Sequence, residues 1–91
     1  MMKKLHLKYA GPVTAITQIL DEFYETHSDT LRGLLDELNA KYGGFHEMFM
    51  DKEKGRLCLN IMIYYHESGK VPCPMMDLDQ IIRDHSTIFF W

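Results

Sequence analysis

Alternating apolar and polar residues open the chain and predict a β-strand. Leu5, Leu7 and Tyr9 occupy every second position of residues 4–9, so they share one face of an extended segment. Glycine and proline in the next three residues, Ala10-Gly11-Pro12, end this strand because both favour a turn. We therefore expect the three apolar side chains to face a core.

A second, weaker strand is expected over residues 21–27, where Phe23 and Tyr24 compete for the inward position. The segment between the two strands, residues 13–20, has no clear period. It fits a long loop, a hairpin connection or one helical turn, and the sequence leaves these alternatives open.

A periodic apolar run predicts the main helix over about residues 30–42. Oxygen-bearing side chains at residues 28–30 precede the run and suit a helix N-cap. Gly43 and Gly44 follow it, and glycine readily adopts the left-handed conformation that ends a helix. Asp36 and Glu37 are expected to point to solvent. The apolar residues recur at helical spacing and share one face: Leu31, Leu34, Leu35, Leu38 and Tyr42.

Strand-forming residues dominate positions 57–65 and predict one continuous strand. One set of alternating side chains contains Cys58, Asn60, Met62 and Tyr64. An unpaired asparagine is costly to bury, so the other set is expected to face the core: Leu57, Leu59, Ile61, Ile63 and Tyr65.

The remaining segments are short. Residues 45–50 are expected to form a short turn. Pro72 and Pro74 restrict their segment to a short edge strand at most, since proline cannot donate to a ladder. We expect a brief helical turn over residues 77–82, and a tight turn at 84–86 that leads into a last strand.

Composition excludes several classes of function. The chain has 91 residues, enough for one domain, residues 1–91. A net charge of -3 gives no basic footprint, so nucleic acid is not an expected partner. No apolar run approaches the ~20 residues that span a bilayer, and the N-terminus lacks the continuous apolar segment of a signal peptide. We expect no membrane association and a cytoplasmic location.

No catalytic or metal-binding signature is present. The five histidines are scattered, without the spacing of a metal motif: His6, His27, His46, His66 and His85. Ser86 follows Asp84 and His85, but no nucleophile elbow surrounds it. Cys58 and Cys73 are expected to be free thiols; a redox or metal role for Cys73, between two prolines, is a minor alternative. We expect no enzyme activity, no cofactor and no metal.

Several short motifs occur in an order typical of one family. They are Tyr9-Ala10-Gly11-Pro12, Thr30-Leu31-Arg32-Gly33-Leu34-Leu35, Lys41-Tyr42, and a leucine-containing turn at Leu78 ahead of Asp84-His85-Ser86. Together they resemble the sulfur-carrier family, which includes the small subunit of molybdopterin synthase and the thiamine sulfur carrier. The resemblance implies an α+β, ubiquitin-like β-grasp fold: a mixed sheet of four to five strands packed on one main helix.

The family's chemistry takes place at a C-terminal Gly-Gly, which is adenylated and converted to a thiocarboxylate. The last glycine here is Gly69 and the sequence ends at Trp91, so we expect this tail to be absent and its role to map onto no residue. The family's last turn carries a glycine where this chain has His85. Histidine tolerates the left-handed conformation better than most residues, so the turn is expected to persist.

The last strand provides a candidate partner-binding site. If Ile88 and Phe90 point into the core, an aromatic pair points outward and joins two residues of the preceding long strand. The predicted set is Met62, Tyr64, Phe89 and Trp91. The resemblance implies a protein partner, either an adenylating enzyme or one like the molybdopterin-synthase large subunit; self-association is the other possibility.

Two functions are therefore open. The first is a non-enzymatic interaction module linked to molybdenum or tungsten cofactor or other sulfur-transfer metabolism. The second is a genuine sulfur-carrier co-substrate, activated at its C-terminus by an adenylating enzyme.

Overall fold

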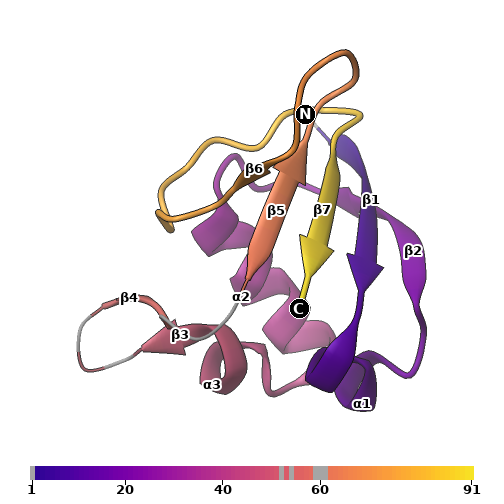
Figure 1. Cartoon of the computed structure of the whole chain (residues 1–91). Coiled ribbons are helices and arrows are strands. Elements are labelled where there is room, and N and C mark those ends of the chain that lie inside the picture. Colours follow the sequence, from indigo (N-terminus) through magenta and orange to yellow (C-terminus); the bar gives the residue numbers. More distant parts are fainter. Residues whose placement is uncertain (1, 52, 54, 59–61) are drawn as a thin grey trace.

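The computed structural model describes residues 2–51, 53, 55–58 and 62–91. Its centre is a mixed five-stranded sheet in the order β2-β1-β7-β5-β6 (Figure 1). The two central strands, β1 and β7, run parallel, and the other neighbouring pairs are antiparallel. The strands are β1 (Lys3–Tyr9), β2 (Asp21–Thr26), β5 (Ile63–His66), β6 (Cys73–Pro74) and β7 (Thr87–Phe90). The expected α+β fold with a mixed sheet is confirmed.

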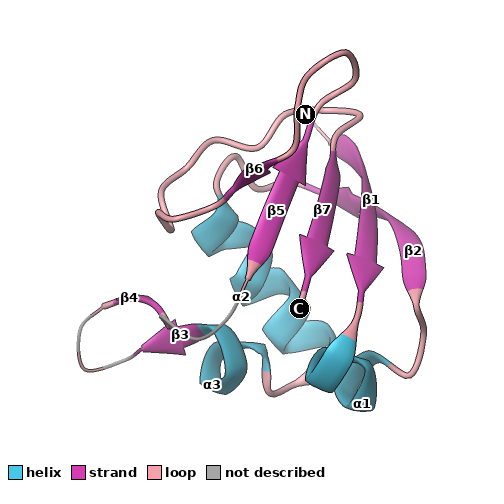
Figure 2. Ribbon diagram, viewed as in Figure 1, coloured by secondary structure: helices cyan, strands magenta, loops and turns pink. Residues whose placement is uncertain are grey.

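The main helix, α2 (Leu31–Tyr42), lies behind the sheet (Figure 2). Its four leucines are fully buried, as the helical spacing predicted. The Thr30 hydroxyl accepts a hydrogen bond from the Gly33 N–H at 3.3 Å, which is the expected N-cap. Gly43 follows the last turn with a φ of 80°. The predicted helix over about residues 30–42 is confirmed.

An aromatic cluster fills the core between α2 and one end of the sheet. The Phe90 ring lies 5.7 Å from Tyr9, 5.8 Å from Phe45 and 5.4 Å from Phe49, measured between centroids. Phe45 and Phe49 belong to a short helix, α3 (Phe45–Phe49), where we predicted a turn. The four-residue spacing puts both rings on one helical face, so burial against Phe90 favours a helix there.

The predicted strand over residues 57–65 is wrong as one continuous element. Arg56–Leu57 (β4) pairs with Met50–Asp51 (β3) in a separate two-stranded ribbon, and only β5 joins the main sheet. Leu57, Ile63 and Tyr65 are buried as predicted. The predictions for Leu59, Asn60 and Ile61 lie outside the described residues.

The segment left open by the sequence, residues 13–20, begins as a helical turn. A 3-10 helix, η1 (Gly11–Val13), leads directly into α1 (Thr14–Thr17). Gln18 ends α1 in the left-handed conformation, with a φ of 60°. The chain then enters β2, which completes the hairpin with β1.

The predicted helical turn over residues 77–82 is present only as a single turn, closed by the Gln80 N–H donating to the Asp77 carbonyl at 3.1 Å, and no helix forms in this segment. Its backbone groups bond to the start of α2: Leu31 and Arg32 donate to the carbonyls of Gln80 and Leu78, at 3.1 and 2.7 Å. The first N–H groups of a helix have no partner within the helix. The segment therefore caps α2 from a distance and adopts a non-helical turn. The following turn, with His85 at a φ of 63°, is present as predicted.

Candidate functional site

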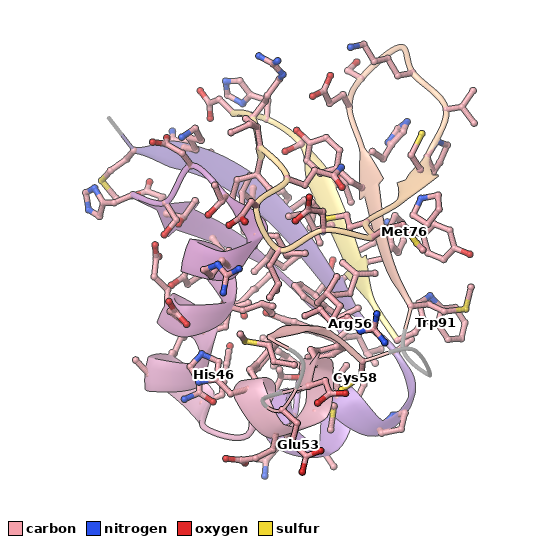
Figure 3. All side chains as sticks on the ribbon, turned by 90° about the vertical axis from the view of Figure 1, so that its left-hand side faces the viewer. His46, Glu53, Arg56, Cys58, Met76 and Trp91 are labelled. Atoms are coloured by element: carbon pink, nitrogen blue, oxygen red, sulfur yellow. The ribbon has the colours of Figure 1, made fainter. Side chains whose placement is uncertain are left out.

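One face of the sheet is uncovered by any described element, because α2 and α3 both lie against the other face (Figures 1 and 3). We call it the open face. Trp91 projects from this side, away from the helices (Figure 3). Strand alternation assigns further residues to it: Lys4, His6 and Lys8 of β1, Asp21, Phe23 and Glu25 of β2, Tyr64 and His66 of β5, and Thr87 and Phe89 of β7.

The structure brings the four predicted site residues together on the open face. Tyr64 lies directly opposite Phe89 in the β5–β7 ladder. The Trp91 N–H donates to the Met62 carbonyl at 3.0 Å, which extends this ladder by one pair. Met62 and Trp91 are 51% and 55% exposed, whereas Tyr64 and Phe89 are half-buried. We call Met62, Tyr64, Phe89 and Trp91 the aromatic patch; its role in binding stays a prediction.

The alternation of β7 explains why the patch is available. Ile88 and Phe90 are completely buried, as the sequence predicted. Their neighbours Phe89 and Trp91 must therefore point the other way. The terminal pair is held by the ladder on both sides, since Ala10 also donates to the Phe90 carbonyl, at 2.9 Å.

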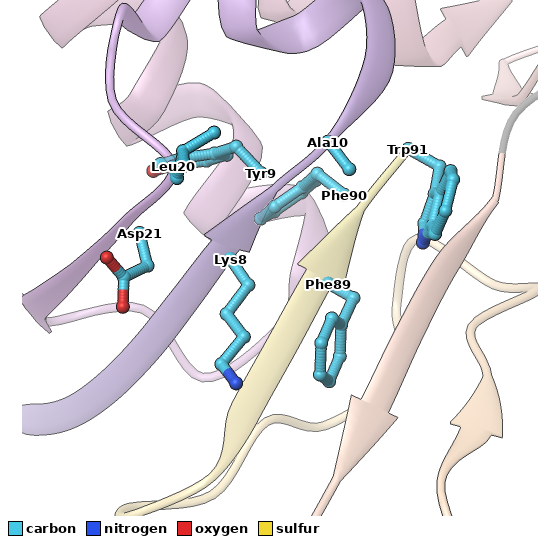
Figure 4. Close-up of a pocket in the computed structure, with 8 residues that line it drawn as sticks. All are labelled: Lys8, Tyr9, Ala10, Leu20, Asp21, Phe89, Phe90 and Trp91. Carbon is cyan, nitrogen blue, oxygen red and sulfur yellow. The ribbon is translucent and has the colours of Figure 1, made fainter.

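A lysine borders the aromatic patch. The Lys8 ammonium lies 5.2 Å from the centroid of the Phe89 ring, within range of a cation–π contact. Between Lys8 and Trp91 the surface is hollowed into a shallow pocket of about 490 Å³, which Phe89, Leu20 and Asp21 also line (Figure 4). This pocket can take an apolar or aromatic side chain, with one cationic and one anionic group beside it.

The other half of the open face contains a ring stack that sequence reasoning missed. Phe23 is 84% exposed, and its ring stacks on His6 with centroids 4.5 Å apart. His6 also contacts Asp21, with 2.8 Å between Nε2 and Oδ2. The sequence left Phe23 and Tyr24 as competitors for the core. The strand register decides this: Tyr24 lies directly opposite Leu5, and residues that are directly opposite point to the same face of the sheet. Because Leu5 is buried, Tyr24 also points to the covered face.

Two carboxylates on the covered side hold β2 against α2. Glu22 accepts hydrogen bonds from the hydroxyls of Tyr9 and Tyr42, at 2.6 and 2.5 Å, and pairs with Lys41 at 2.9 Å. Burial alone would raise the pKa of Glu22, but the hydrogen bonds from Tyr42 and Tyr9 lower it below its usual value of 4.5. The same burial raises the pKa of Tyr9. These contacts join β2 to α2, and the Glu22 carboxylate is fully engaged by its tyrosine and lysine partners, so its role is structural.

Glu37 forms the second such contact, and the prediction that it points to solvent is wrong. It accepts hydrogen bonds from Thr26 at 2.7 Å, from Tyr24 at 3.1 Å and from Ser28. Burial would raise the pKa of Glu37, but the hydrogen bonds lower it below its usual value, and the bond from Ser28 has the largest effect among them. Gly33 makes room for this arrangement, since a Cβ there would lie 2.6 Å from the Ser28 hydroxyl oxygen.

The described residues contain no cluster of three or more His, Cys, Asp or Glu suited to a metal ion. Cys58 is half-buried and Cys73 exposed, both as free thiols. Ser86 is buried and donates to the Arg83 carbonyl, so it does not present a nucleophile. Among the helices of the described chain, none has the length and apolar character needed to cross a membrane.

Comparison with known proteins identifies the fold. No protein-family model and no curated protein matches the sequence. Solved structures do match: Urm1 from Trypanosoma brucei has a TM-score of 0.70 at 15% identity, over 98% of this chain and 90% of that one. The HVO 2177 protein of Haloferax volcanii has a TM-score of 0.69 at 13% identity, over 98% and 83%.

A third solution structure, the small archaeal modifier protein 1 from Methanosarcina acetivorans, has a TM-score of 0.65 at 18% identity, over 99% of this chain and 92% of that one. At sequence identities this low, the matches establish only that the folds are alike. Each match covers nearly the whole of this chain. The fold implied by the sequence motifs is thereby confirmed. This chain has the ubiquitin-like β-grasp fold.

Proposed function

We propose that this protein is a non-enzymatic interaction module that binds a protein partner through its aromatic patch. The observation that carries the proposal is the convergence of Met62, Tyr64, Phe89 and Trp91 on an uncovered sheet face, two of them more than half exposed. Contiguous exposed apolar areas of a few hundred Å² often mark interaction sites.

The chemistry of the patch suits the centre of an interface. Aromatic residues and methionine are enriched at protein interfaces, and large anchors that fill pockets contribute most of the binding energy. A stable interface buries roughly 800 Å² on each partner, so the patch would form its core. Lys8 and Asp21 beside the pocket would then belong to the polar rim and favour a partner with matching charges.

The sequence motifs and the shared fold together suggest the kind of partner. We propose a large subunit like that of molybdopterin synthase or an adenylating enzyme, in the cytoplasm. The setting would be molybdenum or tungsten cofactor synthesis or another sulfur-transfer pathway. A second copy of the chain is the simplest alternative partner. The neighbour described as a small archaeal modifier protein supports a role exercised through other proteins.

The self-association form is tested by measuring solution mass with multi-angle light scattering. Self-association through the patch predicts that the wild type is a dimer and that a Met62→Ser/Phe89→Ser variant is a monomer. Phe23→Ser is the matched control, since it removes an exposed ring from the same face outside the patch. Monomers throughout would leave a foreign partner only, and binding to purified candidate enzymes would then be compared between the same three proteins.

The alternative is a sulfur-carrier co-substrate. The common fold with Urm1 and the archaeal modifier protein supports it. The test is intact mass spectrometry of the protein produced together with an activating enzyme. A species whose C-terminus has exchanged one oxygen for sulfur would favour the carrier. Its absence, with a competent carrier as positive control, would favour the interaction module.

A further inference from the structure

The outer edge of β2 offers a second surface, away from the aromatic patch. β2 is the outermost strand on one side of the sheet, so only the edge that faces β1 is paired (Figure 1). The Tyr9 N–H donates to the Leu20 carbonyl at 2.7 Å, which makes these two residues a hydrogen-bonded pair. Such pairs occur at every second position of an antiparallel ladder.

This register decides which backbone groups are unused. Glu22, Tyr24 and Thr26 direct their N–H and C=O groups toward β1, and the three residues between them direct theirs outward. Those residues are Asp21, Phe23 and Glu25. No described residue bonds to their backbone groups. Three donors and three acceptors therefore line the unpaired side of β2, which we call the free edge.

Side chains of the same three residues give the free edge an acidic–aromatic–acidic pattern. Phe23 is 84% exposed, and exposed carboxylates lie two residues away on each side. Asp21 contacts His6, whereas Glu25 makes no ion pair with any described residue. An exposed strand edge of this length is a template for pairing with another chain, and its charges determine which chain fits.

The protein itself shows which sequence complements β2. On the paired side, β1 sets Lys4 opposite Glu25, His6 opposite Phe23 and Lys8 opposite Asp21. Opposite charges across a ladder stabilise a strand pair, and like charges directly opposite destabilise it. A second copy of β2, aligned antiparallel about Phe23, would set Asp21 of one copy against Glu25 of the other. The occupant is therefore a strand that resembles β1.

We propose that the free edge binds an extended basic peptide segment as a sixth strand. The segment carries lysine or arginine on either side of an aromatic residue or histidine, at alternate positions. Its main chain bonds to Asp21, Phe23 and Glu25, and its cations face the two carboxylates. This surface shares Asp21 with the pocket beside the aromatic patch and is otherwise separate from it, and the proposal does not depend on which partner the patch binds.

The test uses two end-blocked heptapeptides, Thr-Lys-Thr-Phe-Thr-Lys-Thr and the same peptide with glutamate for lysine, titrated into the ¹⁵N-labelled protein. We expect the lysine peptide to bind about tenfold more tightly, from two favourable cross-strand pairs. Its binding should shift the β2 amides and slow hydrogen exchange at Phe23 and Glu25. Exchange at Tyr24, already bonded to β1, should change little.

Charge reversal then checks the assignment. In an Asp21→Lys/Glu25→Lys variant, the glutamate peptide should bind more tightly than the lysine peptide. A Glu47→Lys/Glu53→Lys variant, with the same net charge change at exposed sites elsewhere, should keep the wild-type preference. Equal affinity of the wild type for both peptides, no binding, or shifts centred on Tyr64 and Phe89 would each overturn the proposal, whether or not a variant folds.

Discussion

The two faces of the sheet use the same kind of side chain for different purposes. On β7, Phe90 is fully buried and packs its ring against Tyr9, Phe45 and Phe49. Its neighbour Phe89 points to the open face and contacts Lys8. One strand thus supplies a core anchor and a surface ring in successive residues. The aromatic content of a strand therefore says nothing about function until the covered face of the sheet is known.

The carboxylates of β2 show the same contrast. Glu22, on the covered side, accepts from two tyrosine hydroxyls and one lysine. Glu25, on the open face, makes no ion pair with the described residues. A buried acceptor must be satisfied within the fold, whereas an exposed one is left for solvent or a partner. Position across the sheet therefore separates structural from interactive acids.

The largest expected effect tests the aromatic half of this comparison. Phe90→Ala should lower the free energy of unfolding by about 3–5 kcal/mol, because it removes fully buried ring contacts and leaves a cavity. Phe89→Ala, one residue away on the open face, should cost about 1 kcal/mol or less. Urea unfolding followed by far-UV circular dichroism measures both. Equal losses would show that the open face is also packed.

A smaller effect is expected for the acidic half. Glu22→Ala leaves the hydroxyls of Tyr9 and Tyr42 without their acceptor, and we expect a cost of about 2–3 kcal/mol. Glu25→Ala is the matched change on the open face and should alter stability by no more than about 0.5 kcal/mol. Urea midpoints compare the two. If Glu25→Ala proved equally costly, the edge of β2 would have an unrecognised partner within the fold.

The smallest effect is a pH dependence of stability to which the covered acids contribute. The folded-state pKa values of Glu22 and Glu37 are both lowered from 4.5. Such groups stabilise the fold above their unfolded pKa, and this contribution is lost as pH falls through the folded values. We expect the urea midpoint to decline below about pH 4.5. The decline should be shallower in Glu22→Ala; an identical slope would exclude Glu22 as a source.

Sequence periodicity determined the elements that depend on their own residues. The period of β1 and the helical run of α2 predicted both elements and their buried faces, because alternation and the 3.6-residue turn fix side-chain direction locally. The same argument on β7 placed Ile88 and Phe90 inside and Phe89 outside. A helix of several turns or a single strand needs no distant contact to have a buried face and an exposed face.

Tertiary structure decided everything that depends on a distant partner. Residues 57–65 read as one strand, yet Leu57 pairs with Met50 and Ile63 with Phe90. Residues 77–82 form a single turn and no helix, and their carbonyls accept hydrogen bonds from the start of α2. These outcomes follow from hydrogen-bond demands between segments far apart in the chain, and residue spacing carries no record of them.

The candidate surfaces divide in the same way. Alternation alone put Phe89 and Trp91 on the outside of their strand, but only the strand order brings Met62 and Tyr64 beside them. The free edge of β2 is likewise invisible in the sequence, where an edge strand and a central strand can look alike. Local sequence determines which way a side chain points. Which strands become neighbours depends on the closing of long loops and the burial of a shared core, so the two interaction surfaces exist only in the folded sheet.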